Sequence, residues 1–136
     1  MPRYNKERHD YGTEKERTLK TVLETLVGEP LTGTKNLYSL FDWESPSYCV
    51  ELKSRTAKYS PEQFDKWLLP SCKADYQTEK KKVFFYYWEK GHRLYRLDYN
   101  PDAFQTYQRG EPWGSEQEHL FIPSSEWREV KIEVPV

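Results

Sequence analysis

Residues 83–89, Val-Phe-Phe-Tyr-Tyr-Trp-Glu, would be apolar on both faces if they formed an extended strand. Such a strand has to lie inside a sheet that is covered on each side. The segment therefore predicts a central strand with packing layers above and below it. Core packing explains these rings better than stacking on nucleobases does. After the Lys90-Gly91 turn, residues 92–99 alternate polar and apolar side chains, which predicts a partner strand.

The length of 136 residues fits one domain, residues 1–136. Hydrophobic residues make up 36% and aromatic residues 16%, so large rings must supply much of the core. The formal net charge of −1 gives no overall attraction to nucleic acid, and such binding would need a local basic patch.

No run approaches the ~20 apolar residues of a membrane span. We expect an intracellular chain, cytoplasmic or nuclear, that makes no membrane contact and keeps Cys49 and Cys72 as free thiols.

Periodicity and turn residues predict an α+β order around a central sheet. Residues 1–11 are expected to form a flexible arm, and Thr13 is the predicted N-cap of the first helix, with Glu16 in its capping box. A second helical region is expected from Pro61 to about Thr78, with a break at Pro70. The remaining predicted elements are a helix at 14–27, strands at 37–44, 48–53, 119–123 and 127–134, and a long loop at 101–118.

The segment that points to chemistry is the predicted strand at 48–53. Side chains alternate faces along a strand, so Val50 and Leu52 would point to the core while Glu51 and Lys53 share the opposite face with Cys49. If residues 45–48 form a four-residue loop, Glu44 pairs with Cys49 and Asp42 opposes Glu51. A different loop length would shift this register.

Two opposed carboxylates would repel each other unless a cation lay between them. Mg²⁺ and Mn²⁺ prefer carboxylate oxygens, so Asp42 and Glu51 are candidate metal ligands. A metal ion held there would activate water for phosphodiester hydrolysis. Lys53 would orient that water or neutralise the developing negative charge. These residue types therefore predict a catalytic site.

Asp42 and, nine positions further on, Glu51-Leu52-Lys53 resemble the D…(D/E)xK motif of the PD-(D/E)XK nuclease superfamily. Many members also carry G-x-x-x-E in the first helix, which Gly12 to Glu16 matches. Phe41 stands where the motif proline would be, but that proline is often absent. The likeness covers roughly residues 12–99. It extends to phage-type junction resolvases and to small nuclease-like proteins of large DNA viruses, whose E-x-K-S/N-R stretch is similar to residues 51–55.

The resemblance implies a restriction-endonuclease-like αβββαβ core with a central mixed sheet flanked by helices. It implies a Mg²⁺- or Mn²⁺-dependent nuclease of endonuclease or junction-resolving type, acting on DNA in preference to RNA. Glu16, Asp42 and Glu51 would hold the metal, and Lys53 would be catalytic beside them. A homodimer is favoured because cutting two strands needs two sites. The same likeness makes a viral protein working inside a host cell one expected setting.

Several assignments have alternatives that the sequence leaves open. Glu16 can serve as a helix-capping residue only, with Glu14 or Glu24 as the helix acid of the site. Nucleic-acid-binding candidates near the motif can equally be solvated surface charges; they are Arg55, Lys58 and Lys73. The run Lys80–Lys82 is expected to be a solvated stretch before a strand. The rival functions are a non-catalytic nucleic-acid-binding module on the same fold and a protein-interaction domain.

Overall fold

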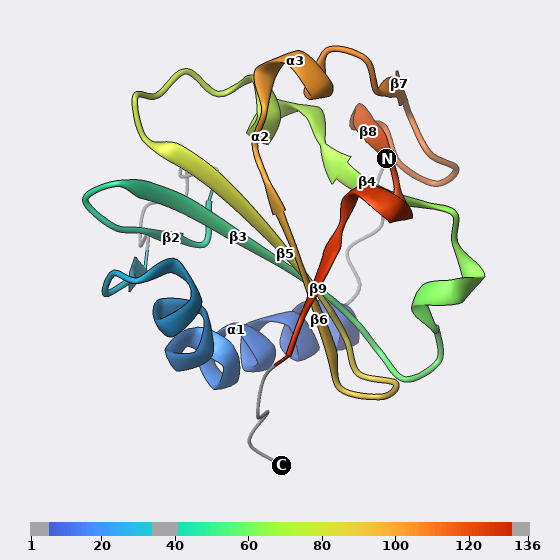
Figure 1. Ribbon diagram of the computed structural model, residues 1–136. Helices are drawn as coiled ribbons and strands as arrows, with labels where there is room; N and C mark the ends of the chain where they lie inside the picture. The colour runs from blue at the N-terminus through green and yellow to red at the C-terminus, as the bar shows by residue number, and fades with distance from the viewer. Residues whose placement is uncertain (1–5, 34–40, 132–136) are drawn as a thin grey trace.

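A long helix crosses one face of a mixed β-sheet in the computed structural model, which describes residues 6–33 and 41–131 (Figure 1). Two short 3₁₀ turns, Pro61–Gln63 and Ser124–Glu126, lie between the main elements. The helices and strands are α1 (Lys6–Val27), β1 (Thr32–Gly33), β2 (Trp43–Glu44), β3 (Tyr48–Arg55), β4 (Lys66–Pro70), α2 (Ser71–Asp75), β5 (Lys81–Trp88), β6 (Arg93–Asp98), α3 (Pro101–Phe104), β7 (Gln108–Gly110), β8 (His119–Pro123) and β9 (Arg128–Val130).

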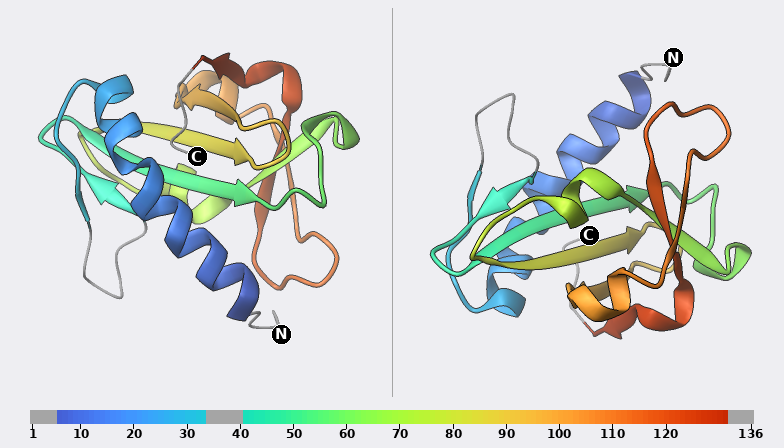
Figure 2. Two further views of the ribbon diagram at one scale, coloured as in Figure 1. Left: turned by 90° about the horizontal axis from the view of Figure 1, so that it is seen from below. Right: turned by 90° about the horizontal axis from the view of Figure 1, so that it is seen from above.

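The described strands form a larger sheet of order β1-β2-β3-β5-β6-β9 and a smaller one of order β4-β8-β7. In the larger sheet β3 and β5 run parallel, and every other adjacent pair runs antiparallel. The chain passes from β3 to β5 through β4 and α2, which lie over the face of the larger sheet opposite α1 (Figure 2). The molecule therefore has three layers, and the prediction of an α+β fold with a mixed sheet is confirmed.

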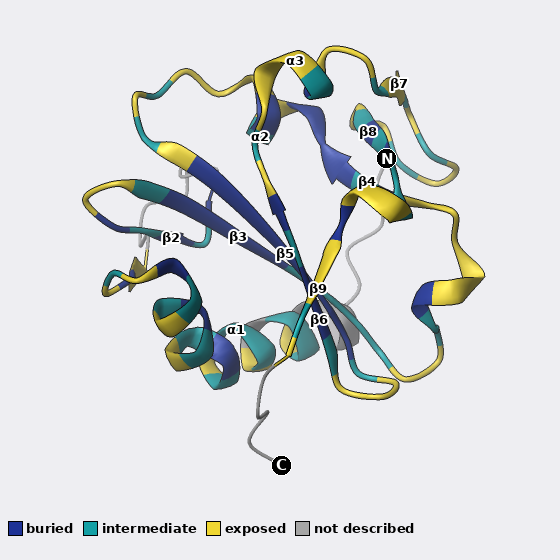
Figure 3. Ribbon diagram, viewed as in Figure 1, coloured by how far each residue is buried: buried dark blue, intermediate teal, exposed yellow. Residues whose placement is uncertain are grey.

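Strand β5 is buried along almost its whole length, as its two apolar faces predict (Figure 3). Phe85 and Tyr87 pack in a cluster with Leu19 and Leu23 of α1. On the opposite face, Phe84, Tyr86 and Trp88 pack against β4 and β8. The covering layer on that second face is thus mainly a sheet. Of the flanking helices that the sequence resemblance implies, only the short α2 and α3 lie on this face.

Helix α1 ends at Val27 as predicted, but it begins at Lys6, well before the expected start at residue 14. Its end is fixed by Gly28, which has φ 87° and donates its N–H to Glu24 O at 2.8 Å. Thr13 lies inside the helix, so it is not an N-cap and Glu16 is not part of a capping box. The predicted arm at 1–11 is wrong for residues 6–11, which are helical, while residues 1–5 lie outside the described part of the chain.

The early start of α1 has a tertiary cause. The Tyr11 hydroxyl contacts Arg55 O at 3.1 Å and Glu89 Oε2 at 3.0 Å. Lys15 Nζ forms an ion pair with the same Glu89 oxygen at 2.9 Å. These contacts join the first turns of the helix to the ends of β3 and β5, and local capping preferences cannot reveal them.

The predicted hairpin is present, with its first strand shorter than expected. Glu44 pairs with Cys49 and Trp43 with Val50, and Ser45 N donates to Tyr48 O at 2.9 Å across the turn. Strand β2 covers only Trp43–Glu44, because the chain bends at residues 41–42; residues 37–40 lie outside the described part. Strand β3 forms where predicted and extends to Arg55.

The prediction of a helical region from Pro61 to Thr78 is wrong for its middle part. Residues 66–70 form β4, which pairs antiparallel with β8 and buries Trp67 and Leu69 on one face. Only residues 71–75 are α-helical. The pairing partner lies some fifty residues further along the chain, so local periodicity carries no sign of it. The loop expected at 101–118 likewise contains α3 and β7.

The C-terminal strands agree with the sequence analysis. β8 occupies the predicted 119–123, and β9 covers part of the predicted 127–134, of which 132–134 lie outside the described residues. Cys49 is buried, Cys72 is exposed, and neither is in a disulfide. No helix within the described ranges has the length and apolar character needed to cross a bilayer.

Candidate functional site

Strand β3 presents Glu51 and Lys53 on the face opposite α1. Val50 and Leu52 pack in the α1 cluster, whereas Cys49 packs with the residues of β4 and β8. This is the alternation that the sequence predicts. Glu51 is only 4% exposed, so its carboxylate has lost nearly all of its contact with water. A charged group in that position needs compensation from its neighbours.

Asp42 lies beside β3 but outside the ladder, because β2 begins only at the next residue, Trp43. The ladder between the strands ends at Trp43 and Val50, which leaves the N–H of Leu52 without a strand partner. Asp42 Oδ2 accepts that N–H at 2.9 Å. The carboxylate therefore replaces a backbone acceptor and lies between the two faces of the sheet.

Glu16 comes from the other side, on α1, and is hydrogen bonded to Asp42. Asp42 is in turn hydrogen bonded to Glu51. The other helix acids lie elsewhere: Glu14 is exposed and Glu24 accepts the Leu31 N–H at 2.8 Å. Of the three alternatives, Glu16 is thus the one beside Asp42. The structure joins all three predicted ligands through two contacts that share Asp42.

The electrostatics of this cluster are unfavourable to full ionisation. Burial raises the pKa of Glu51 to about 8, and the negative charge of Asp42 adds to the rise, while Lys73 and Lys53 oppose it. Burial and Asp42 likewise raise the pKa of Glu16 to about 8. A hydrogen bond between two carboxyl groups requires a proton on one of them. Without a cation, the cluster therefore retains protons that ordinary carboxylates release.

The two oxygens of Glu51 have different surroundings. Oε2 forms an ion pair with Lys73 Nζ at 2.6 Å, and the two side chains are only 5% and 17% exposed. Oε1 is buried and has no donor within the described part of the chain. Buried polar atoms almost always have a partner, and no N–H or hydroxyl group in the described part of the chain supplies one to this oxygen.

Lys53 lies where the motif predicts, close enough to influence the ionisation of both Glu16 and Glu51. Its charge also acts on His119 of β8, whose pKa is lowered first by burial and then by Lys53 and Arg55. His119 Nδ1 is 2.8 Å from Gln117 O. Sequence reasoning did not connect His119 with the motif, because its approach to β3 depends on the unpredicted pairing of β4 with β8.

The remaining nucleic-acid-binding candidates lie further along the same strand and in the loop after it. Arg55 Nη2 donates to the Tyr86 hydroxyl at 3.2 Å, and its side chain is partly exposed at the end of β3. Lys58 is exposed, with its amine 5.7 Å from the centre of the Tyr59 ring. Both therefore lie on the side of Lys53 away from Glu51, whereas Lys73 lies against Glu51 itself.

The acid cluster has the ligand type that a hard divalent cation requires, but its side chains are not arranged in a coordination geometry. Among the described side chains, those of residues 10–12, 14–33 and 41–131, no trio of His, Cys, Asp and Glu is already arranged around a single point. The carboxylate oxygens are nevertheless the ligand type that Mg²⁺ and Mn²⁺ take, and Glu51 Oε1 lacks a donor. Glu16, Asp42 and Glu51 are thus the described residues best suited to hold such an ion.

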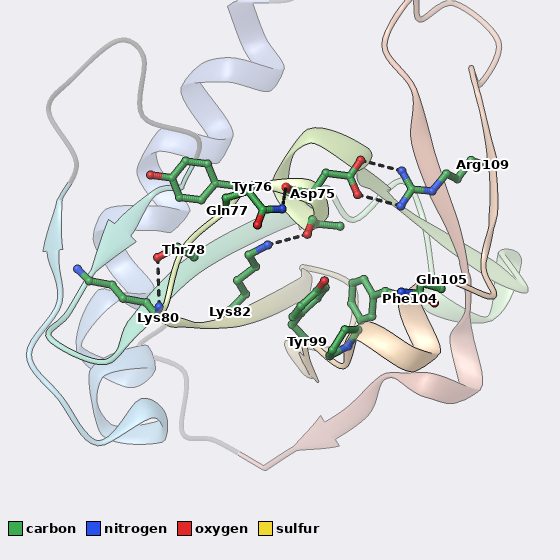
Figure 4. Close-up of a pocket in the computed structure, with 12 residues that line it drawn as sticks. Asp75, Tyr76, Gln77, Thr78, Lys80, Lys82, Tyr99, Phe104, Gln105 and Arg109 are labelled. Carbon is green, nitrogen blue, oxygen red and sulfur yellow. Dashed lines mark hydrogen bonds and ion pairs between the residues drawn. The ribbon is translucent and has the colours of Figure 1, made fainter.

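A separate cavity of about 460 Å³ lies behind α2 (Figure 4). Lys82, which the sequence predicts to be solvated, is only 5% exposed there and donates to Ala74 O at 2.6 Å. Its amine lies 4.5 Å from the centre of the Tyr99 ring. Asp75 and Arg109 form a bidentate ion pair at the same cavity, with distances of 2.8 and 2.9 Å. None of the three predicted metal ligands lines it.

Comparison with known proteins adds no assignment. The chain matches no protein-family model and no curated protein.

Proposed function

We propose that this chain is a divalent-metal-dependent nuclease that hydrolyses phosphodiester bonds, with Mg²⁺ or Mn²⁺ as its cofactor. The observation that carries the proposal is the contact series Glu16–Asp42–Glu51, which joins a helix, a bend and a strand far apart in the sequence. A group of carboxylates in contact, one buried and two partly buried, is costly for a protein unless it serves a cation or a proton transfer. Lys53 beside these acids favours hydrolysis at phosphorus over simple ion storage.

Each residue of the site has a distinct role in this proposal. Glu16, Asp42 and Glu51 would hold the ion, and the Leu52 N–H fixes the orientation of Asp42. When bound, a divalent cation lowers the pKa of a coordinated water and neutralises charge on the phosphate. The Lys53 amine would donate hydrogen bonds to the attacking water or to a phosphate oxygen as negative charge builds there.

The finer parts of the proposal rest on the sequence resemblance. They are a PD-(D/E)XK-type core, DNA as the favoured nucleic acid, and an endonuclease or junction-resolving activity. A homodimer that places two sites on two strands, and an intracellular setting, belong to the same proposal. The partly exposed Arg55 and the exposed Lys58 would then contact phosphates of a substrate that extends along β3 from the acid cluster.

The test uses the purified chain with labelled single-stranded, duplex and four-way-junction DNA in Mg²⁺, Mn²⁺ or EDTA. We expect cleavage that requires the metal and falls by about 10²–10³-fold in Lys53→Met. Lys90→Met, which changes an exposed lysine in the turn after β5, is the matched control and should cleave normally. Calorimetric titration with Mn²⁺ should show binding to wild type and to Lys53→Met.

Two results would overturn the proposal. One is the absence of Mn²⁺ binding by the folded wild-type chain, because the acid cluster would then have no cation to serve. The other is metal binding together with undiminished cleavage in Lys53→Met, since that activity would have to come from a different site or a contaminant.

A further inference from the structure

Lys73 lies in direct contact with the acid cluster, although its position in the sequence marks it only as a candidate for substrate phosphate. Its amine is 2.6 Å from Glu51 Oε2, and the contact is shielded from solvent by the low exposure of both side chains. The same amine lies 5.8 Å from the centre of the Phe41 ring, one residue before Asp42. Lys73 is therefore enclosed between β3 and the bend that carries Asp42.

The short helix α2 that carries Lys73 is itself held firmly in place. Directly after Lys73, Ala74 O accepts a hydrogen bond from the buried Lys82 amine. Asp75, the next residue, forms its bidentate ion pair with Arg109 of β7, and Figure 4 shows both anchors on the cavity side of the helix. These contacts fix the backbone of α2. The anchored helix in turn positions the Lys73 amine against Glu51.

The two carboxylate oxygens of Glu51 therefore have different surroundings. Oε2 is occupied by Lys73, while Oε1 is buried and has no donor in the described part of the chain. Asp42 is held in a similar way, because its Oδ2 accepts a hydrogen bond from the Leu52 N–H. Outer partners of this kind orient a metal-binding carboxylate so that a particular oxygen faces the ion.

We infer that Lys73 is a positioning residue for the metal site, a role that rests on the proposed nuclease function. It holds Glu51 by Oε2 so that Oε1 faces the cation. Lys73 does not bind substrate phosphate. To do so, its amine would have to break the solvent-shielded contact with Glu51 Oε2, which is unfavourable for a buried pair.

The experiment compares two measurements on Lys73→Met, Lys73→Arg and wild type. The first is the affinity for Mn²⁺ by calorimetry, without DNA. The second is DNA affinity in EDTA at several salt concentrations, where no cleavage occurs. We expect Lys73→Met to bind Mn²⁺ about 10–100-fold more weakly, with Lys73→Arg recovering part of the loss, and the salt dependence of DNA binding to stay unchanged.

Lys15→Met is the matched control, because Lys15 is also ion-paired with a glutamate, at 2.9 Å, and its side chain is 18% exposed against 17% for Lys73. Its Mn²⁺ affinity should stay at the wild-type value. Should Lys73→Met fail to fold, Lys73→Arg and Lys73→Gln provide the same comparison with the hydrogen bond to Glu51 retained.

The inference is overturned if Lys73→Met binds Mn²⁺ as tightly as wild type. It is also overturned if the slope of log affinity against log salt falls by about one in that variant, the result expected for a lost phosphate contact. In both cases wild-type metal binding and cleavage would leave the proposed function standing. Failure of wild type to bind Mn²⁺ would instead end both proposals.

Discussion

The Asp42 carboxylate takes the place of a strand partner for Leu52, accepting its backbone N–H at 2.9 Å just beyond the last ladder pair of β2 and β3. This bond explains how one side chain can contact acids on both faces of the larger sheet. A residue in the regular ladder would point to one face only. Because β2 ends early, Asp42 lies at the sheet edge, where Glu16 approaches from α1 and Glu51 from the opposite face.

Substitution of Asp42 should separate its structural role from its role in metal binding. Asp42→Asn keeps an oxygen that can accept the Leu52 N–H, so we expect a folded protein that binds Mn²⁺ at least about tenfold more weakly. Asp42→Ala leaves that N–H without an acceptor and should lower the free energy of unfolding by about 1–3 kcal/mol more than Asp42→Asn does. Chemical denaturation and calorimetric titration with Mn²⁺ measure the two effects. Equal stabilities for the two variants would show that the bond to Leu52 contributes nothing.

The stability of the metal-free protein should fall as the pH rises. The pKa values of Glu16 and Glu51 are raised from 4.5 to about 8, so between these values the folded chain holds protons that the unfolded chain has released. The resulting stabilisation is complete below pH 4.5 and is lost as the pH rises through 8. Glu51→Gln removes the more deeply buried of these two carboxyl groups. We expect it to be more stable than wild type at pH 8 by about 1–3 kcal/mol, since one pH unit in a pKa corresponds to about 1.4 kcal/mol.

Denaturation in EDTA at several pH values tests this dependence. Glu44→Gln is a suitable control, because this carboxylate is on β2, is 44% exposed and lies outside the acid cluster. Its curve should follow that of wild type. A wild-type stability that is flat from pH 5 to pH 8 would mean that the cluster does not retain protons in solution.

Part of the site could be predicted from the sequence because it depends on short-range rules. The face on which Glu51 and Lys53 lie follows from their two-residue spacing along a strand. The pairing of Glu44 with Cys49 follows from the length of the turn between them, and it also brings Asp42 towards Glu51. The central position of β5 follows from its apolar faces alone. Each of these needs fewer than a dozen consecutive residues.

The contacts that the sequence does not predict are those between segments far apart in the chain. The pairing of Lys73 with Glu51 requires the position of α2, which follows β4, and β4 is a strand only because β8 is available to pair with it. Its sequence, Lys-Trp-Leu-Leu-Pro, suits a helix as well as a strand when taken alone. The same reason accounts for the approach of His119 to Lys53 and for the contacts that extend α1 back to Lys6.

The contacts of Tyr11 should account for part of the stability of the first turns of α1. Its hydroxyl lies within hydrogen-bonding distance of both Arg55 O and Glu89 Oε2, and Tyr11→Phe removes it while keeping the ring. We expect a loss of about 0.5–1.5 kcal/mol in the free energy of unfolding, together with faster amide hydrogen exchange in the described turns before Thr13. Tyr76→Phe, at a side chain that is 40% exposed, is the matched control and should change stability by less than about 0.5 kcal/mol. Unchanged exchange in Tyr11→Phe would show that these turns are held by other contacts.

Lys58 should contribute to nucleic-acid binding through its charge alone, if substrate extends along β3 beyond Arg55. Lys58 is exposed in the loop that follows this strand, so its removal should not disturb the fold. Because one phosphate contact releases about one counterion, Lys58→Gln should lower the slope of log affinity against log salt by about 0.9 on duplex DNA. Fluorescence anisotropy in EDTA gives this slope without cleavage. Arg128→Gln, on β9 at the far edge of the larger sheet, should leave it unchanged. Equal slopes for Lys58→Gln and wild type would show that Lys58 makes no phosphate contact, which would leave Arg55 as the candidate.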